Sequence, residues 1–157
     1  MKVSKLGLAA ALFATGILGS SIVMAADTAS VAVSATVTGT CKFNSGGAVS
    51  FTLDPSSGSD ATGSVTQPAF WCTKTASYTV DDDMGIHEAV SGSAPRRMQH
   101  SSLSEFIPYT FNYTTTGTGA GKTAPITMDI ASSISNADFV NASAGSYTDT
   151  VTLSITP

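Results

Sequence analysis

The sequence has few charged residues and, beyond its first 25 residues, no apolar run long enough to span a membrane. Only 11% of its 157 residues are charged, seven of them basic and eleven acidic. Setting aside Lys2 and Lys5 leaves five basic residues (7 − 2) against eleven acidic ones. This balance argues against a surface for nucleic acid or anionic lipid. The lack of long apolar runs argues against membrane insertion of the mature chain.

Residues that carry catalysis or bind metals are also scarce. The two histidines, His87 and His100, lie far apart without a metal-binding signature, and no nucleophile elbow or paired-carboxylate motif is present. The run from Gly117 to Thr123 resembles a phosphate-binding loop, but Thr116 stands where that motif needs Gly. The residues after it have the pattern of a strand, where the motif needs a helix. We therefore expect no enzyme activity and no cofactor.

Three consecutive aspartates, Asp81, Asp82 and Asp83, could supply oxygen ligands to a calcium ion. They lack the ligand spacing and the terminal Glu of a calcium-binding loop. A solvated turn is the favoured interpretation, and ion binding stays open as an alternative.

Residues 1–25 have the pattern of a secretory signal peptide. Lys2 and Lys5 precede a mostly apolar run, and Val23-Met24-Ala25 fits the small-residue rule for cleavage. A membrane anchor is the alternative, but Gly16 and Gly19 interrupt the apolar run. We expect an exported chain that begins at Ala26.

The rest of the chain, residues 26–157, has the composition and pattern of one secreted all-β domain. Ser, Thr, Gly and Ala are abundant, and Val, Ile, Phe and Tyr occupy most apolar positions. Short alternating segments separated by turn signals predict a β-sandwich with no convincing helix. We expect a loop or two short edge strands over residues 84–104 and a turn over residues 114–122. Residues 136–144 should be irregular, with Phe139 pointing inward. Alternation is clearest over residues 49–53, 78–80, 109–113, 126–130 and 147–155.

The segment before the first cysteine also alternates. Val31, Val33, Ala35 and Val37 occupy every second position, as on the apolar face of a strand. Terminal segments are usually loose unless something fixes them, and a free apolar strand is prone to aggregation. This segment therefore either pairs within its own domain or is meant for another chain.

Two further pairs of residues stand out. Cys41 and Cys72 are the only cysteines, and an even number in an exported chain predicts a disulfide. Free thiols or a metal pair are the alternatives, and neither suits an oxidising compartment. Arg96 and Arg97 would face opposite sides of a strand. An ion pair with an aspartate or a contact with a neighbouring subunit would explain them.

Several motifs together resemble the spore coat protein U domain, a subunit type of archaic, Csu-like chaperone–usher pili. The resemblance covers nearly all of residues 26–157, and residues 145–152 are among its most specific parts. The motifs are, in order, Cys41-Lys-Phe43, Phe51-Thr-Leu-Asp-Pro-Ser-Ser-Gly-Ser59, Cys72-Thr-Lys-Thr-Ala-Ser-Tyr78 with Arg96-Arg97-Met98, and Ala144-Gly-Ser-Tyr-Thr-Asp-Thr-Val-Thr-Leu153.

The resemblance implies an incomplete immunoglobulin-like sandwich that lacks its last strand. A periplasmic chaperone would fill the resulting groove first, and the N-terminal extension of the next subunit would then replace it, with an outer-membrane usher assembling the pilus. Residues 26–34 would be this donor extension, with Val31 and Val33 inserted, and residues 35–157 the domain, whose first strand would include Ala35 and Val37. The groove would be lined by Tyr147, Val151, Leu153 and Ile155 of the last strand.

The implied function is a structural subunit of a surface pilus that supports adhesion and biofilm formation, with copies of itself or related subunits as partners. Two other functions remain open on the sequence. One is a secreted spore or cell-surface coat protein, and the other is a monomeric carbohydrate-binding sandwich, for which the single Trp is a weak sign.

Overall fold

The computed structural model describes residues 26–89 and 95–157, and the chain divides into two units. Within the first unit, residues 26–35 form neither helix nor strand, and all are exposed. The second unit, Thr36–Pro157, is the folded domain. The expected signal peptide, residues 1–25, lies outside the described residues.

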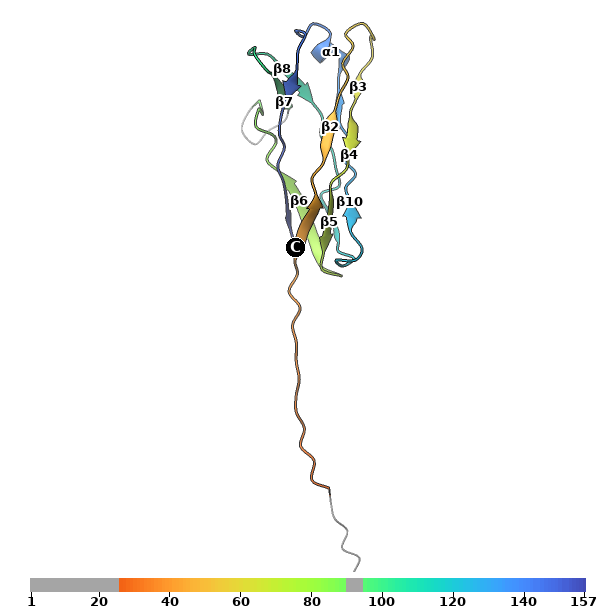
Figure 1. The fold of residues 1–157 in the computed structure, drawn as a ribbon, viewed down its shortest axis with the longest axis vertical. Helices are drawn as coiled ribbons and strands as arrows, with labels where there is room; N and C mark the ends of the chain where they lie inside the picture. The colour runs from red at the N-terminus through yellow and green to blue at the C-terminus, as the bar shows by residue number, and fades with distance from the viewer. Residues whose placement is uncertain (1–25, 90–94) are drawn as a thin grey trace, which may run out of the picture. The chain divides into compact units, whose positions relative to one another are not determined.

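The domain consists of short strands and a single helical turn among its described residues (Figure 1). The helical turn is α1 (Asn136–Phe139). The strands are β1 (Cys41–Ser45), β2 (Ala48–Ser50), β3 (Ala61–Thr62), β4 (Ser64–Thr66), β5 (Ala69–Cys72), β6 (Ser77–Asp82), β7 (Arg96–His100), β8 (Phe106–Tyr109), β9 (Thr116–Thr118), β10 (Ile126–Thr127), β11 (Ser133–Ile134), β12 (Tyr147–Thr148) and β13 (Leu153–Thr156).

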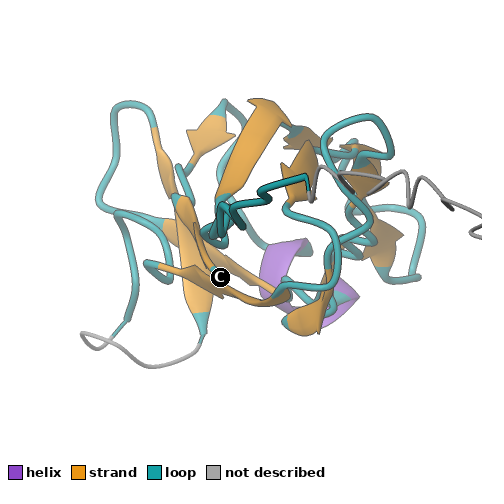
Figure 2. Ribbon diagram, turned by 90° about the horizontal axis from the view of Figure 1, so that it is seen from below, coloured by secondary structure: helices purple, strands orange, loops and turns teal. Residues whose placement is uncertain are grey.

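All the pairings between these strands are antiparallel, which agrees with the expected all-β class. Five small sheets result within the described residues, ordered β1-β5-β10, β13-β6-β9, β12-β7-β8, β11-β3 and β2-β4. Viewed from below, the strands surround the interior of the domain (Figure 2). The C-terminus lies at the end of the domain where β1 begins, and α1 lies at the opposite end (Figure 1). We call these the disulfide end and the α1 end.

Two clusters of buried side chains form the core. The larger cluster follows from the alternation in β5 and β6, which buries Phe70 and Cys72 on one strand and Tyr78 and Val80 on the other. The smaller cluster contains Ile107, Ile134 and Phe139, the last at 1% exposure, so the predicted inward position of Phe139 is confirmed.

Three local expectations were wrong. Residues 35–40 are not part of a strand, because β1 begins only at Cys41, and Val37 is 81% exposed. Residues 116–118, expected within a turn, form β9 beside β6. At Gly117, a Cβ atom would collide with the Tyr78 ring, so the absence of a side chain permits this close approach. Residues 136–139, expected to be irregular, form α1.

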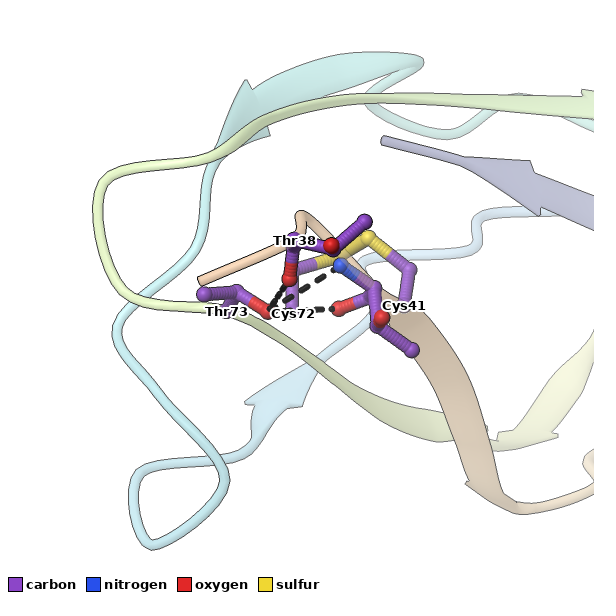
Figure 3. The surroundings of a disulfide bond; sticks show 5 residues. Thr38, Cys41, Cys72 and Thr73 are labelled. Carbon is purple, nitrogen blue, oxygen red and sulfur yellow. Dashed lines mark hydrogen bonds between the residues drawn. A yellow bond between two sulfur atoms is a disulfide. The ribbon is translucent and has the colours of Figure 1, made fainter. Parts of the chain in front are cut away.

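The predicted disulfide is confirmed. Cys41 and Cys72 are opposite each other in the β1–β5 register and are covalently joined. Next to this bond, Thr73 holds the segment that leads into β1 (Figure 3). The backbone N–H of Thr40 donates to Thr73 Oγ1 at 3.0 Å, and the Thr73 N–H donates to the Thr40 carbonyl at 2.9 Å. The chain therefore enters the domain at a covalently fixed point.

We expect loss of this bond to destabilise the domain by about 3–4 kcal/mol, because the oxidised unfolded chain is constrained by a closed loop. The Cys41→Ser/Cys72→Ser variant should show this loss in urea unfolding. Dithiothreitol should reproduce it in the wild-type protein and leave the double variant unchanged. Mass spectrometry of the non-reduced exported protein should find no free thiol, and finding two would contradict the assignment.

Candidate functional site

A groove runs along the last part of the chain, between strands that have only one neighbour each. Among the described strands, β12 pairs only with β7, β13 only with β6, and β2 only with β4. Each of these strands therefore has a second edge whose backbone groups have no strand partner in the described residues. Such edges are templates for an added strand.

Two adjoining cavities occupy the space between β2 and the last strands. Their volumes are about 420 Å³ and about 670 Å³, and they share Val49, Phe51, Met98, Tyr147 and Thr148. The first extends to Gly47 and Leu153, and the second extends to Pro55 and Ala142. Together the two cavities form one continuous groove.

The floor of this groove is the core itself. Ile130 of the larger core cluster lines the first cavity, and Ile107 and Phe139 of the smaller cluster line the second. In a closed sandwich such residues would be covered by a further strand on the same face. Apolar side chains entering the groove would therefore bury surface against the core.

The middle of the last strand segment is held by polar side chains. Between β12 and β13, Asp149 accepts hydrogen bonds from Tyr109 Oη at 2.6 Å and from the Ile86 N–H at 3.0 Å. Asp83 accepts one from the Thr152 N–H at 2.8 Å. Burial, and secondly the bond to Asp149, raise the pKa of Tyr109 well above its usual value. The phenol therefore stays protonated and can donate.

These contacts position the groove edge. Where the chain passes from β12, which pairs with β7, to β13, which pairs with β6, two backbone hydrogen bonds reach the Thr150 and Thr152 carbonyls. The Asp149 and Asp83 carboxylates supplement them. No pattern in the sequence indicated this role for Asp149. A Tyr and an Asp forty residues apart carry no local signature of their contact.

At the α1 end, a second polar group holds β12. Tyr147 Oη donates to Glu105 at 2.9 Å, and Glu105 also accepts from the Ser143 hydroxyl at 2.7 Å. The hydrogen bonds from Ser143 and then Tyr147 lower the pKa of Glu105. The ring of Tyr147 lies edge-on against His100, with centroids 4.9 Å apart. The Tyr147 ring is thus fixed at the groove wall.

Of the last-strand residues expected to line the groove, Tyr147, Val151 and Leu153 do so. Ile155 does not, which corrects that part of the expectation. It pairs opposite Val80 and packs against the larger core cluster, where β1 also packs against β13 and closes the space. The opposite wall of the groove, which contains Val49 and Phe51, was not predicted from the sequence, although both residues belong to a segment of alternating apolar residues.

The two predicted donor residues lie in the other unit. Val31 is 84% exposed and Val33 is 90% exposed. Full burial of a Val side chain contributes about 1.5–3 kcal/mol relative to exposure. Their role in a neighbouring groove stays a prediction.

Both arginines of β7 are engaged within the chain, one on each side of the strand. The Arg96 guanidinium donates to both carboxylate oxygens of Asp82, each at 2.6 Å, and Phe111 lies beneath it at 5.4 Å. Arg97 donates to the His87 and Glu88 carbonyls and lies over Phe106 at 4.2 Å. The internal ion pair that the sequence left open therefore exists for Arg96, and a subunit contact by either arginine remains a prediction.

We expect Arg96→Ala to destabilise the domain by about 3 kcal/mol, because it leaves the carboxylate of Asp82 almost buried without its partner. Burial alone would raise the pKa of Asp82, but hydrogen bonds from Arg96 and Tyr113 outweigh it and lower the pKa below 3.8. A lowered pKa contributes stability above pH 3.8 that is lost as the pH falls through the folded value. The difference from wild type should therefore shrink in acid.

Arg97→Ala is the matched control, since Arg97 also stacks on a phenylalanine but donates to carbonyls. Urea unfolding should show that the stability difference between wild type and Arg96→Ala is smaller at pH 3 than at pH 7. The difference between wild type and Arg97→Ala should stay the same. An equal narrowing for both variants would contradict the assignment to Asp82.

The other candidate sites have structural uses. Asp82 and Asp83 accept the hydrogen bonds described above, and groups of three or more metal-binding side chains do not occur within residues 26–89 and 95–157. The loop that resembles a phosphate-binding motif leads into strand β10, in agreement with the sequence pattern. In the described part of the chain, no helix is long and apolar enough to cross a membrane.

The comparison with protein families is decisive for this chain. Residues 27–154 match the family model for the spore coat protein U domain. The chain belongs to the spore coat protein U domain family. This confirms the resemblance that the motifs indicated. No curated protein sequence matches this chain.

One solved structure similar to this spore coat protein U domain is the CsuC–CsuE chaperone–tip adhesion subunit pre-assembly complex from archaic chaperone–usher Csu pili of Acinetobacter baumannii. The sequence identity is 19% and the TM-score 0.45. The match covers 76% of this chain and 40% of the other, so this chain spans less than half the length of the one it matches.

Proposed function

We propose that this spore coat protein U domain is a structural pilus subunit that polymerises by donor-strand exchange. Residues 26–34 of one copy enter the groove of the next copy and act as its missing strand. The observation that carries the proposal is the groove itself, whose floor is formed by core residues and whose neighbouring strands are each paired on one edge only. Family membership supports it.

The physical chemistry of the groove suits an extended segment. Backbone N–H and C=O groups of an added strand would bond to the free edge, and alternate side chains would enter the groove. Val31 and Val33 lie two residues apart and would point to the same face of such a strand. A shift by one residue would replace them with Ser30, Ala32 and Ser34, so the apolar face fixes the register.

The same contact explains assembly and its control. A tail that fills another copy's groove makes a head-to-tail contact that does not close, and filaments result. Before assembly the groove needs a cover, which we assign to a periplasmic chaperone, and we assign assembly at the outer membrane to an usher. The product would be a surface pilus that supports adhesion and biofilm formation.

Val31→Asp should be exported and bind its chaperone but fail to polymerise. The carboxylate would enter an apolar groove unpaired, which costs more than the lost burial of Val. The domain itself should keep its unfolding midpoint, because residue 31 is outside the core. Filament formation is measured by electron microscopy and by mass under non-denaturing conditions.

Ser30→Asp is the matched control, because residue 30 would face away from the groove and should tolerate a charge. Deleting residues 27–34 should also give chaperone-bound monomer. Filaments of normal length from the deletion variant would refute donor-strand exchange. An unfolded domain despite the chaperone would show instead that the tail is an internal strand.

A further inference from the structure

A lysine-rich surface surrounds Trp71 at the disulfide end. Lys42 is directly opposite Trp71 in the β1–β5 register, so both side chains project from the same face. Their sequence neighbours Phe43, Phe70 and Cys72 belong to the core side, which places Lys42 and Trp71 outward. The ammonium group of Lys122 lies 5.8 Å from the centre of the Trp71 ring.

Lys74 belongs to the same surface. The turn that carries Lys122 passes beside it, because a Cβ atom on Gly121 would lie 3.7 Å from that of Lys74. All three lysines are exposed. In residues 26–89 and 95–157 the one ion pair is Arg96 with Asp82, so these lysines have no carboxylate partner there. We call Lys42, Lys74, Lys122 and Trp71 the lysine patch.

The α1 end has the opposite charge. Asp54, Asp60 and Asp138 are exposed there, and Asp60 accepts a hydrogen bond from the Asn136 N–H at the start of α1, at 2.8 Å. The segments that form this end, residues 51–62, 101–106 and 135–147, contain no Lys or Arg. After residue 25 every lysine of the chain therefore lies at the disulfide end.

We propose that the lysine patch of one copy contacts the acidic α1 end of the next copy in the filament. The proposal rests on the proposed function and names a second contact beside the donor strand. A tail paired antiparallel to the last strand would run from Thr156 towards Tyr147, and its residue 35 would leave the groove at the α1 end. Residues 36–41 then span at most about 20 Å. The donor's lysine patch is thus held close to the acceptor's acidic end.

Electrostatics favours this pairing over other contacts between copies. With five basic and eleven acidic residues after residue 25, two copies repel each other on average. The lysine patch is the surface that attracts an acidic copy. Exposed ion pairs contribute little stability each, and salt screens them beyond about 8 Å at physiological ionic strength. The contact would therefore orient incoming copies and speed their association, while the donor strand holds them.

Cross-linking of filaments tests the contact directly. Filaments are assembled from equal amounts of ¹⁵N-labelled and unlabelled wild-type protein, and a carbodiimide then joins amines to touching carboxylates. We expect mixed-isotope peptides that join Lys42, Lys74 or Lys122 to Asp54, Asp60 or Asp138. Filaments whose lysines couple only to other carboxylates, such as Asp81 or Asp129, or to none, would overturn the proposal.

Charge reversal tests its effect on assembly. Lys42→Glu/Lys122→Glu should slow polymerisation at low salt by about tenfold, and Asp60→Lys/Asp138→Lys should do the same. Mixing the two double variants should restore most of the rate, because every lysine patch or its reversed form then meets an α1 end of opposite charge in an alternating filament. Combining all four changes in one chain should do the same. Asp81→Lys/Asp129→Lys is the control.

The control is matched to the acidic reversal. Asp129 and Asp60 each accept a backbone N–H, while Asp81 and Asp138 are exposed and accept no side-chain hydrogen bond within the described residues. Thermal unfolding of each variant verifies folding. Equal slowing by the control, or no rescue in the four-fold variant, would overturn the proposal. If wild-type copies do not polymerise at all, both proposals fail, whereas a loss confined to Val31→Asp leaves only the donor-strand proposal standing.

Discussion

Along one edge of β12 and β13 the backbone N–H and C=O groups have no strand partner in the described residues, and the other features of the domain are arranged around this edge. Buried N–H and C=O groups need partners, and a strand with one neighbour satisfies only one of its edges. Here β12 pairs with β7, and β13 pairs with β6. In the segment between β12 and β13, the Asp149 carboxylate and the nearby Asp83 carboxylate make further hydrogen bonds. The opposite edge opens onto a groove whose floor is the core. An extended apolar segment bonded to this edge would cover that floor.

The features that hold the domain together lie around the groove. The disulfide fixes the start of β1 to β5. The Arg96–Asp82 pair ties β7 to β6, so that the two strands that carry β12 and β13 are joined by a bidentate contact. These covalent and charge-assisted contacts add to the apolar burial of the two core clusters.

The sequence pattern predicted those features that depend on residues close together in the chain. Alternation correctly predicted the buried face of β6 at Tyr78 and Val80, and the cysteine count predicted the disulfide. It failed for Val37, because alternation describes a face while a strand also needs a neighbour bonded through the backbone. Within the described residues, residues 35–39 have no backbone–backbone hydrogen bond. It also could not predict that Val49 and Tyr147 share one groove. Their closeness depends on the order of strands across sheets, which no window of sequence contains.

The distribution of charge would determine which end of an incoming copy approaches the groove, and the groove alone does not determine this. A main-chain hydrogen-bond template accepts strands with little regard to their sequence, so orientation and choice of partner must come from elsewhere. In the proposed assembly, side-chain register would provide part of this selectivity through Val31 and Val33. Lysines at the disulfide end and the exposed Asp54, Asp60 and Asp138 at the α1 end would provide a second part, because they distinguish a copy approaching by its disulfide end from one approaching by its α1 end. In a chain with so few charges, the three lysines after residue 25 carry this distinction because they lie on one surface.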